Sequence, residues 1–129
     1  MEVLSDRIQQ RRAVNDFYKD IFSNIDAVNL FSEASSDFFS NHWLSCITID
    51  KKVTTRTNQE LMAAFAEENI ETRPLWKPMH LQPVFNDCPY YGETVSEELF
   101  TAGLCLPSGS NITNDDKNRI YEVISKYQF

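Results

Sequence analysis

The feature that most constrains the fold is a proline-punctuated segment, residues 70–92. It contains Pro74, Pro78, Pro83 and Pro89. Proline fixes φ, lacks an amide hydrogen and restricts the residue before it, so a helix cannot run through such a segment. We therefore expect an ordered, extended loop here, with regular secondary structure on both sides of it.

Hydrophobic spacing predicts the elements before this loop. Apolar residues recur at helical spacing over residues 2–25, which predicts a long first helix without a capping residue at its start. Residues 28–31 predict a short extended segment, and the aromatic and β-branched run 43–49 predicts a strand that is buried on both faces. Thr57 with Glu60 forms a capping box that predicts a helix ending near Asn69.

The elements after the loop are shorter. A helix over about residues 96–102, capped by Thr94 or Ser96 and ended by Gly103, leads into a buried strand at residues 104–106. Thr113 with Asp116 caps a final helix. That helix has its predicted core face at Ile120, Ile124 and Tyr127, with Val123 beside it. Helices alternating with few short strands define an α+β class with a small sheet.

Length and charge exclude several functions. A chain of 129 residues suits one domain, and its net charge of −7 has the wrong sign for nonspecific binding to nucleic acid or an anionic membrane. No apolar signal core or long apolar run is present, so the expected compartment is the cytoplasm. Cys46, Cys88 and Cys105 are odd in number and show no paired spacing, which favours reduced thiols and no metal site.

The proline-rich loop also holds the clearest candidate binding residues. Arg73, Trp76, Lys77 and His80 combine a guanidinium fork, a stacking face, a point charge and a ring that can donate or accept a hydrogen bond. This combination suits an anionic ligand that bears a ring, such as a sugar nucleotide. The alternative is structural: Trp76 packs under the loop, while Arg73 and Lys77 are solvated or paired with carboxylates.

Other chemistry has weaker support in the residues. The three glycines are isolated, so no phosphate-cradling motif can be drawn. Cys88 or Ser108 could be combined with His80 into a nucleophilic pair or triad, but nothing in the sequence indicates that these side chains lie close together.

The same loop carries a family resemblance. The run ETRPLWKPMHLQPVF, followed by CPYYG, SEELF and GLCLPSG, resembles the C-terminal small domain of DegT/StrS-type sugar aminotransferases that depend on pyridoxal phosphate (PLP). The opening MEVLSDRIQQRR is similar to the long helix that joins the two domains of these enzymes, and SNHWLSCITID is similar to the strand that follows. The resemblance covers nearly the whole chain, in the family's order.

The resemblance implies a fold and a division of the chain. Residues 1–129 would be one C-terminal small domain, as in fold-type I PLP aminotransferases: a linking helix over 1–25 and an α+β body over 26–129 with a small, mostly antiparallel sheet. The large domain, whose lysine holds the cofactor as a Schiff base, is absent from this sequence, and Met1 falls at an interior position of the family's pattern. We therefore expect a fragment or truncated member that binds no PLP alone and carries no catalytic residue.

The resemblance also implies the activity of the full-length enzyme. It would transfer an amino group from glutamate to a nucleotide-linked keto sugar, as a homodimer, with this domain covering one side of the substrate cleft. Arg73, Trp76, Lys77 and His80 would line the sugar-nucleotide side, with Asn41 and Trp43 as weaker candidates. Two alternatives remain: a stand-alone binding module without chemistry, and a fragment that self-associates through an exposed apolar stripe on its first helix.

Overall fold

A computed structural model describes residues 2–129 and places the expected elements in an α+β arrangement. Over these residues the elements are α1 (Leu4–Phe22), β1 (Val28–Leu30), β2 (Ser45–Ile49), α2 (Asn58–Glu67), β3 (Arg73–Pro74), the 3-10 turns η1 (Met79–Leu81) and η2 (Pro83–Phe85), α3 (Val95–Ala102), β4 (Gly103–Leu106) and α4 (Asn114–Lys126). The fold class predicted from the sequence is confirmed.

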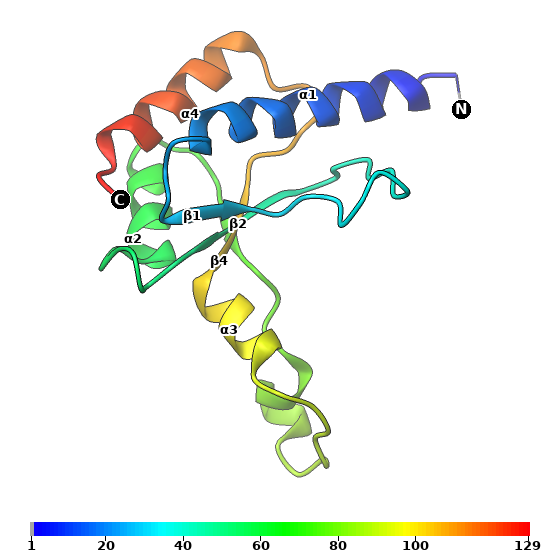
Figure 1. Cartoon of the computed structure of the whole chain (residues 1–129), viewed down its shortest axis with the longest axis vertical. Coiled ribbons are helices and arrows are strands. Elements are labelled where there is room, and N and C mark those ends of the chain that lie inside the picture. The colour runs from blue at the N-terminus through cyan, green and yellow to red at the C-terminus, as the bar shows by residue number, and fades with distance from the viewer. Residues whose placement is uncertain (1) are drawn as a thin grey trace.

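The strands form one antiparallel sheet in the order β1-β2-β4-β3. Side chains alternate across it, so that Ser45, Ile47 and Ile49 of β2 are buried while Cys46 and Thr48 point to the opposite face. Helices α1, α2 and α4 pack on the first face. Figure 1 shows α1 and α4 together on one side of the sheet. The opposite face borders surface hollows and is called the open face below.

The core lies between the helices and the covered face. Tyr18, Leu61, Phe65 and Leu104 have no solvent exposure, and Ile47 has almost none. The hydroxyl of Tyr18 donates to the carbonyl of Pro107 at 2.9 Å, which fastens α1 to the segment that follows β4. Burial raises the pKa of Tyr18, so this hydroxyl keeps its proton and remains a donor.

Helix α1 is shorter than the hydrophobic pattern predicted. It ends at Phe22, because Ser23 and Asn24 favour a turn and the hydroxyl of Ser23 donates to the carbonyl of Asp20 at 2.8 Å. At its start Val3 offers no side-chain cap, as predicted. Leu4 is exposed, since the first turns of α1 extend beyond the sheet (Figure 1).

The capping box predicted at Thr57 and the cap predicted at Thr113 are both present, and each is a complete capping box. The hydroxyl of Thr57 accepts from the amide of Glu60 at 3.2 Å, and the Glu60 carboxylate accepts from the amide of Thr57 at 2.8 Å. Thr113 and Asp116 repeat this exchange at the start of α4. Thr94 precedes α3 as one of the two predicted caps, but its hydroxyl donates to Glu98 instead of capping the helix.

The proline-rich segment is more structured than an extended loop. It contains the two-residue strand β3 and the turns η1 and η2, the first of which follows Pro78 while the second begins at Pro83. Proline suits the start of a short 3-10 turn because its φ is already helical and its missing amide hydrogen is not needed there. Together with α3, these turns project away from the sheet in Figure 1. We refer to residues 76–102 as the arm.

Replacing Tyr18 by Phe tests the link between α1 and the segment after β4. The variant keeps the ring but removes the donor to Pro107, so we expect the free energy of unfolding to fall by about 1–2 kcal/mol. Urea denaturation measures it. Tyr121→Phe is the matched control, because Tyr121 is exposed on α4 and its loss should change stability by less than about 0.5 kcal/mol. Equal effects in the two variants would contradict a structural role for the Tyr18 hydroxyl.

Candidate functional site

Two tryptophans from distant parts of the chain meet on the open face of the sheet. Trp43 precedes β2, Trp76 follows β3, and their rings stack with centroids 6.0 Å apart at an interplanar angle of 27°. Both remain well exposed, at 59% and 67%. They border a hollow of about 540 Å³, called the tryptophan hollow, which is lined by Trp43, Leu44, Arg73, Pro74, Leu75, Trp76 and Cys105. The hollow therefore contains two of the four main candidates.

Arg73 stands at the edge of this hollow because β3 pairs with β4 in a register that puts Arg73 opposite Cys105. Its guanidinium pairs with the carboxylate of Glu71, with Nε at 2.6 Å from Oε1. Both side chains are largely exposed, and exposed ion pairs contribute only about 0–1 kcal/mol. An anionic ligand can therefore compete for the guanidinium at low cost.

His80 and Lys77 lie outside the tryptophan hollow. The Nε2 atom of His80 is 2.9 Å from the Glu97 carboxylate on α3, and its ring stacks on Tyr90 with centroids 3.8 Å apart. These contacts hold η1 against α3 and leave His80 only 16% exposed. Lys77 is exposed, and its carbonyl accepts from the side chain of Gln82. The structure thus separates the four main candidates, which the sequence had grouped by proximity, into two places.

Asn41 belongs to a loop that shapes the approach to Trp43. Its side-chain oxygen accepts from the amide of Trp43 at 3.1 Å, which is a turn-forming contact. The neighbouring His42 is buried with φ at 44°, in the left-handed region that costs a non-glycine residue about 1 kcal/mol. This backbone persists only because other contacts hold the loop in place.

Glu33 supplies those contacts. Its carboxylate accepts from the guanidinium of Arg12 at 2.9 Å and from the amide of Ser40 at 3.1 Å, and it lies 3.4 Å from Nε2 of His42. The Arg12 guanidinium, followed by the Ser40 amide, lowers the pKa of Glu33 to about 2. The neighbouring Arg11 donates to the carbonyl of Trp43. Helix α1 therefore positions Trp43 through a cluster that the sequence did not reveal.

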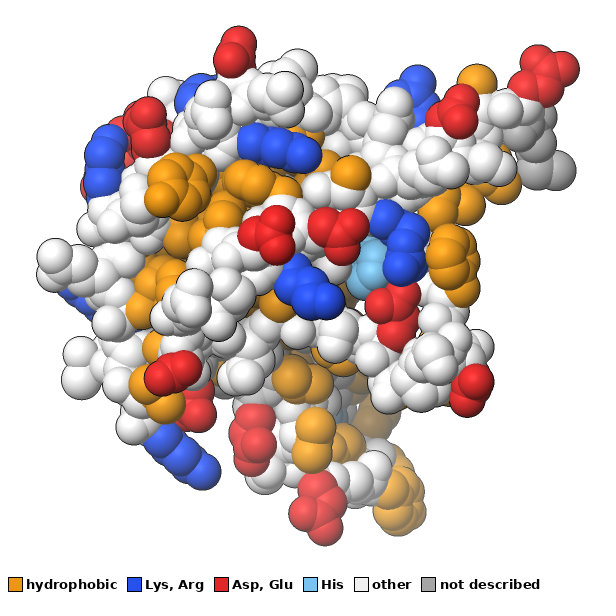
Figure 2. All heavy atoms as spheres, turned by 45° about the horizontal axis from the view of Figure 1, so that its top comes forward, with side chains coloured by type: hydrophobic (Ala, Val, Ile, Leu, Met, Phe, Trp, Pro, Cys, Tyr) orange, Lys and Arg blue, Asp and Glu red, His pale blue; other side chains and the backbone are white. Residues whose placement is uncertain are grey.

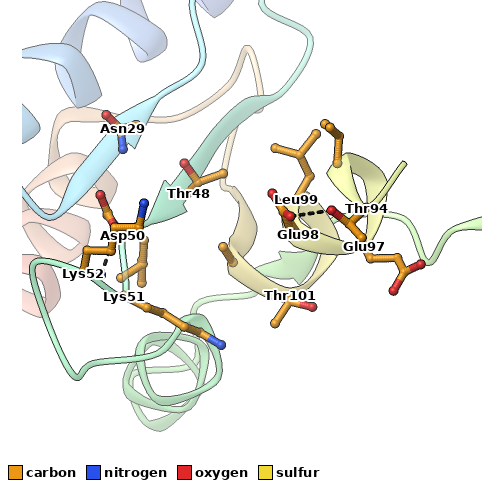
Figure 3. A pocket seen from close by; sticks show the side chains of 13 residues that line it. Asn29, Thr48, Asp50, Lys51, Lys52, Thr94, Glu97, Glu98, Leu99 and Thr101 are labelled. Carbon is orange, nitrogen blue, oxygen red and sulfur yellow. Dashed lines mark hydrogen bonds between the residues drawn. The ribbon is translucent and has the colours of Figure 1, made fainter. Parts of the chain in front are cut away.

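A larger hollow of about 670 Å³ lies between the turn after β2 and helix α3. Figure 3 shows Asp50, Lys51 and Lys52 on one side and Thr94, Glu98 and Thr101 on the other. The hydroxyl of Thr94 donates to Glu98 at 2.6 Å, the interaction drawn between them in the same view. None of the residues singled out for binding lines this hollow.

The remaining chemical candidates take structural roles. The Ser108 hydroxyl donates to the carbonyl of Leu106 and accepts from the amide of Ser45, both at 2.7 Å, so it joins the ends of β4 and β2. Cys88 is exposed on the arm.

Within residues 2–129, no three histidine, cysteine or acidic side chains are grouped to hold a metal ion, and no helix could cross a membrane. Figure 2 shows charges of both signs and exposed apolar side chains interspersed on one face.

An antiparallel sheet covered by helices on one face defines the α+β architecture of the chain. The chain belongs to the DegT/DnrJ/EryC1/StrS aminotransferase family, whose model matches residues 1–125. EpsN of Bacillus subtilis (strain 168) is 40% identical over 128 residues, covering 96% of this chain and 32% of the relative. Its assignment as a pyridoxal phosphate-dependent aminotransferase is inferred. GDP-perosamine synthase of Escherichia coli O157:H7 is 29% identical over 127 residues, covering 98% of this chain and 33% of the relative.

Solved structures show the same fold. DesI, solved in the presence of its TDP-sugar product, superposes with a TM-score of 0.81 at 22% identity, covering 95% of this chain and 31% of that one. PseC of Helicobacter pylori, an aminotransferase of pseudoaminic acid biosynthesis, gives 0.77 at 19% identity, covering 92% and 32%. The chain therefore spans about a third of the length of the relatives it matches. The resemblance seen in the sequence is confirmed.

The depressed pKa of Glu33 predicts an acid-dependent contribution to stability. Above its ordinary pKa of 4.5 the native carboxylate is charged and paired, whereas its contribution is lost as the pH falls through about 2. We expect Glu33→Gln to be less stable than the parent chain at pH 6, with the difference shrinking toward pH 2. Urea denaturation across this range measures it.

Glu71→Gln is the control for this prediction, because Glu71 also faces an arginine but lies in a largely exposed pair. That substitution should change stability little at any pH. A difference between Glu33→Gln and the parent that stays constant from pH 6 to pH 2 would show that the charge of Glu33 is not what holds the loop.

Proposed function

We propose that this chain is the C-terminal domain of a PLP-dependent aminotransferase that acts on nucleotide-linked keto sugars in amino-sugar or polysaccharide biosynthesis. Residues 1–129 act as one domain, with 1–25 as the linking helix and 26–129 as the body that covers one side of the substrate cleft. Family membership supports the aminotransferase class, and relatives that make or carry nucleotide sugars support the substrate class. The observation that carries the proposal is the tryptophan hollow with Arg73 at its edge.

The tryptophan hollow suits a ligand that joins a ring to phosphate groups. Exposed indole faces stack on nucleobase or sugar rings and gain apolar contact without desolvating a charge. A guanidinium fork matches phosphate oxygens in a bidentate way, and the pair that Arg73 now makes with Glu71 is weak enough to exchange. In a chain of net charge −7, such a local cation is needed to offset a diphosphate. Lys77, next to Trp76 and exposed, adds a second positive charge.

His80 and Asn41 act at the margins of this ligand. Glu97 holds Nε2 of His80 at 2.9 Å, which fixes the ring plane and makes the other ring nitrogen available to hydrogen-bond the sugar or a neighbouring residue of the cleft. Asn41 shapes the turn that presents Trp43, while its amide nitrogen contributes a donor at the surface. Both are assigned to substrate binding and neither to a chemical step.

The cofactor itself does not fit the residues of this chain. PLP supplies an electron sink for amino transfer and is held through a lysine, a phosphate cradle and an acid beside the pyridine nitrogen. Within residues 2–129, Lys117 is the least exposed lysine, and its ammonium lies over the ring of Phe17 instead of in a polar cleft. We therefore assign no step through PLP to this chain and propose that a separate large domain binds it, in a cytoplasmic homodimer that uses glutamate as amino donor.

A fluorescence titration tests the proposed substrate class. Both tryptophans of the chain line the hollow, so a nucleotide diphosphate sugar bound there should quench their emission directly. We expect saturable quenching by the sugar nucleotide, and Arg73→Ala should weaken the affinity about tenfold, which is about 1.4 kcal/mol. Arg119→Ala is the matched control, since Arg119 lies on α4 and donates to the Glu68 carbonyl far from the hollow. If both variants lowered the affinity for the sugar nucleotide equally, the effect of Arg73→Ala would come from the change in net charge and not from a contact in the hollow.

A chimera tests the activity. Replacing the matching third of EpsN by this chain joins it to a large domain of the same family, and we expect amino transfer from glutamate to a nucleotide-linked keto sugar. In this chimera His80→Ala should lower kcat at least tenfold with little change in Tm. Glu97→Ala removes the same hydrogen bond but keeps the imidazole. If both variants lowered kcat equally, the role of His80 would be to hold the arm in place and not to contact the sugar. Sugar binding by the isolated chain together with an inactive, folded chimera would favour a binding module without chemistry.

A further inference from the structure

Two cysteines face each other on the open face of the sheet. Cys46 of β2 is the direct cross-strand partner of Cys105 of β4, and their Sγ atoms are 3.6 Å apart. Although they are distant in sequence, the strand pairing makes them nearest neighbours. The proposed function leaves this pair unused, and no metal-ligand group includes it among residues 2–129.

The hydrogen-bond pattern of the sheet shows that this position suits a disulfide. The carbonyl of Cys46 accepts from the amide of Phe31 at 2.9 Å, so the backbone of Cys46 points toward the β1 side. The amide of Ser45 points the other way, toward Ser108. Cys46 and Cys105 are therefore a pair without mutual backbone hydrogen bonds, the type whose Cα atoms lie about 4.5 Å apart. That separation is within the range of about 4.4–6.8 Å that disulfides bridge.

The two thiols differ in their access to solvent. Cys46 is half-buried beside the hollow that also contains Phe31 and Leu99, whereas Cys105 is 6% exposed at the tryptophan hollow. Burial, together with the neighbouring Cys105 sulfur, raises the pKa of Cys46 to about 12. Cys46 is therefore a thiol at neutral pH, and its oxidation has to proceed through a small thiolate fraction.

We propose that Cys46 and Cys105 are an oxidation site that a peroxide converts into a disulfide linking β2 to β4. The Cys46 thiolate attacks one oxygen of hydrogen peroxide, which breaks the O–O bond, forms a sulfenic acid and releases hydroxide that is protonated to water. The Cys105 sulfur then attacks the Cys46 sulfur, and the sulfenic hydroxyl leaves as a second water with the proton of Cys105. Two thiols are oxidised, one peroxide is reduced, and a dithiol reductant reverses the change.

The consequence of the disulfide falls on the tryptophan hollow, because Cys105 lines it beside Trp76 and Arg73. Moving that sulfur toward Cys46 changes the wall of the hollow and locks the two central strands together. The inference rests on the strand register and the sulfur separation, so it does not depend on the identity of the ligand.

The test uses the 129-residue chain with Cys88→Ser, which removes the exposed thiol that would otherwise form links between chains. After exposure to hydrogen peroxide, remaining thiols are alkylated and the protein is analysed by intact mass and peptide mapping. We expect the loss of two hydrogen atoms, a cross-linked peptide pair containing Cys46 and Cys105, full reversal by a dithiol, and a Tm higher by about 10 °C. The chain with all three cysteines should give the same cross-link.

Cys46→Ser in the same background is the matched control, since it should leave Cys105 alkylatable after the same treatment. Two outcomes would overturn the inference: both thiols remaining alkylatable in the parent, or both being oxidised to sulfinic acids without a cross-link. A Cys105 that becomes equally protected in the Cys46→Ser variant would also overturn it, because the pair would then not be required.

Discussion

The structure depends on a small sheet that is covered on one face only. The side chains of Ile47 and Leu104 have almost no exposure beneath α1, α2 and α4, and this burial is the main favourable term that such a short chain has. Because strand side chains alternate, fixing Ile47 inward also fixes Cys46 and Thr48 outward. The open face is thus a direct consequence of the core and not a separate feature of the sequence.

Contacts between distant segments then place side chains around that face. Glu33 joins α1 to the loop before Trp43 through Arg12, across 21 residues of sequence, and His80 joins η1 to α3 through Glu97. Each contact involves charged or titratable groups that are partly shielded from water, where such bonds are stronger than at a fully exposed surface. The loops that carry Trp43 and Trp76 are therefore held by polar clusters, while the helices behind the sheet are held by apolar packing.

This division explains how much of the fold could be predicted from the sequence. The capping boxes at Thr57 and Thr113 are complete within four residues, so the sequence alone located the starts of α2 and α4. The end of α1 was placed too late, because apolar spacing continues to Ile25 whereas Ser23 turns the chain earlier. The two capping boxes could be predicted because all of their hydrogen bonds join residues of one sequence motif, whereas apolar spacing alone does not mark where a helix ends.

The candidate site was harder to predict for the same reason. Proximity in sequence grouped Arg73 with His80, but strand pairing sets Arg73 beside Cys105 while η1 takes His80 to α3. Nothing local marks Glu33 as the partner of Arg12, or Cys46 as the partner of Cys105, since both pairs exist only once the sheet register is set. A surface built on one face of an antiparallel sheet draws each neighbour from a different strand, so its composition is readable from the sequence only after the strand order β1-β2-β4-β3 is known.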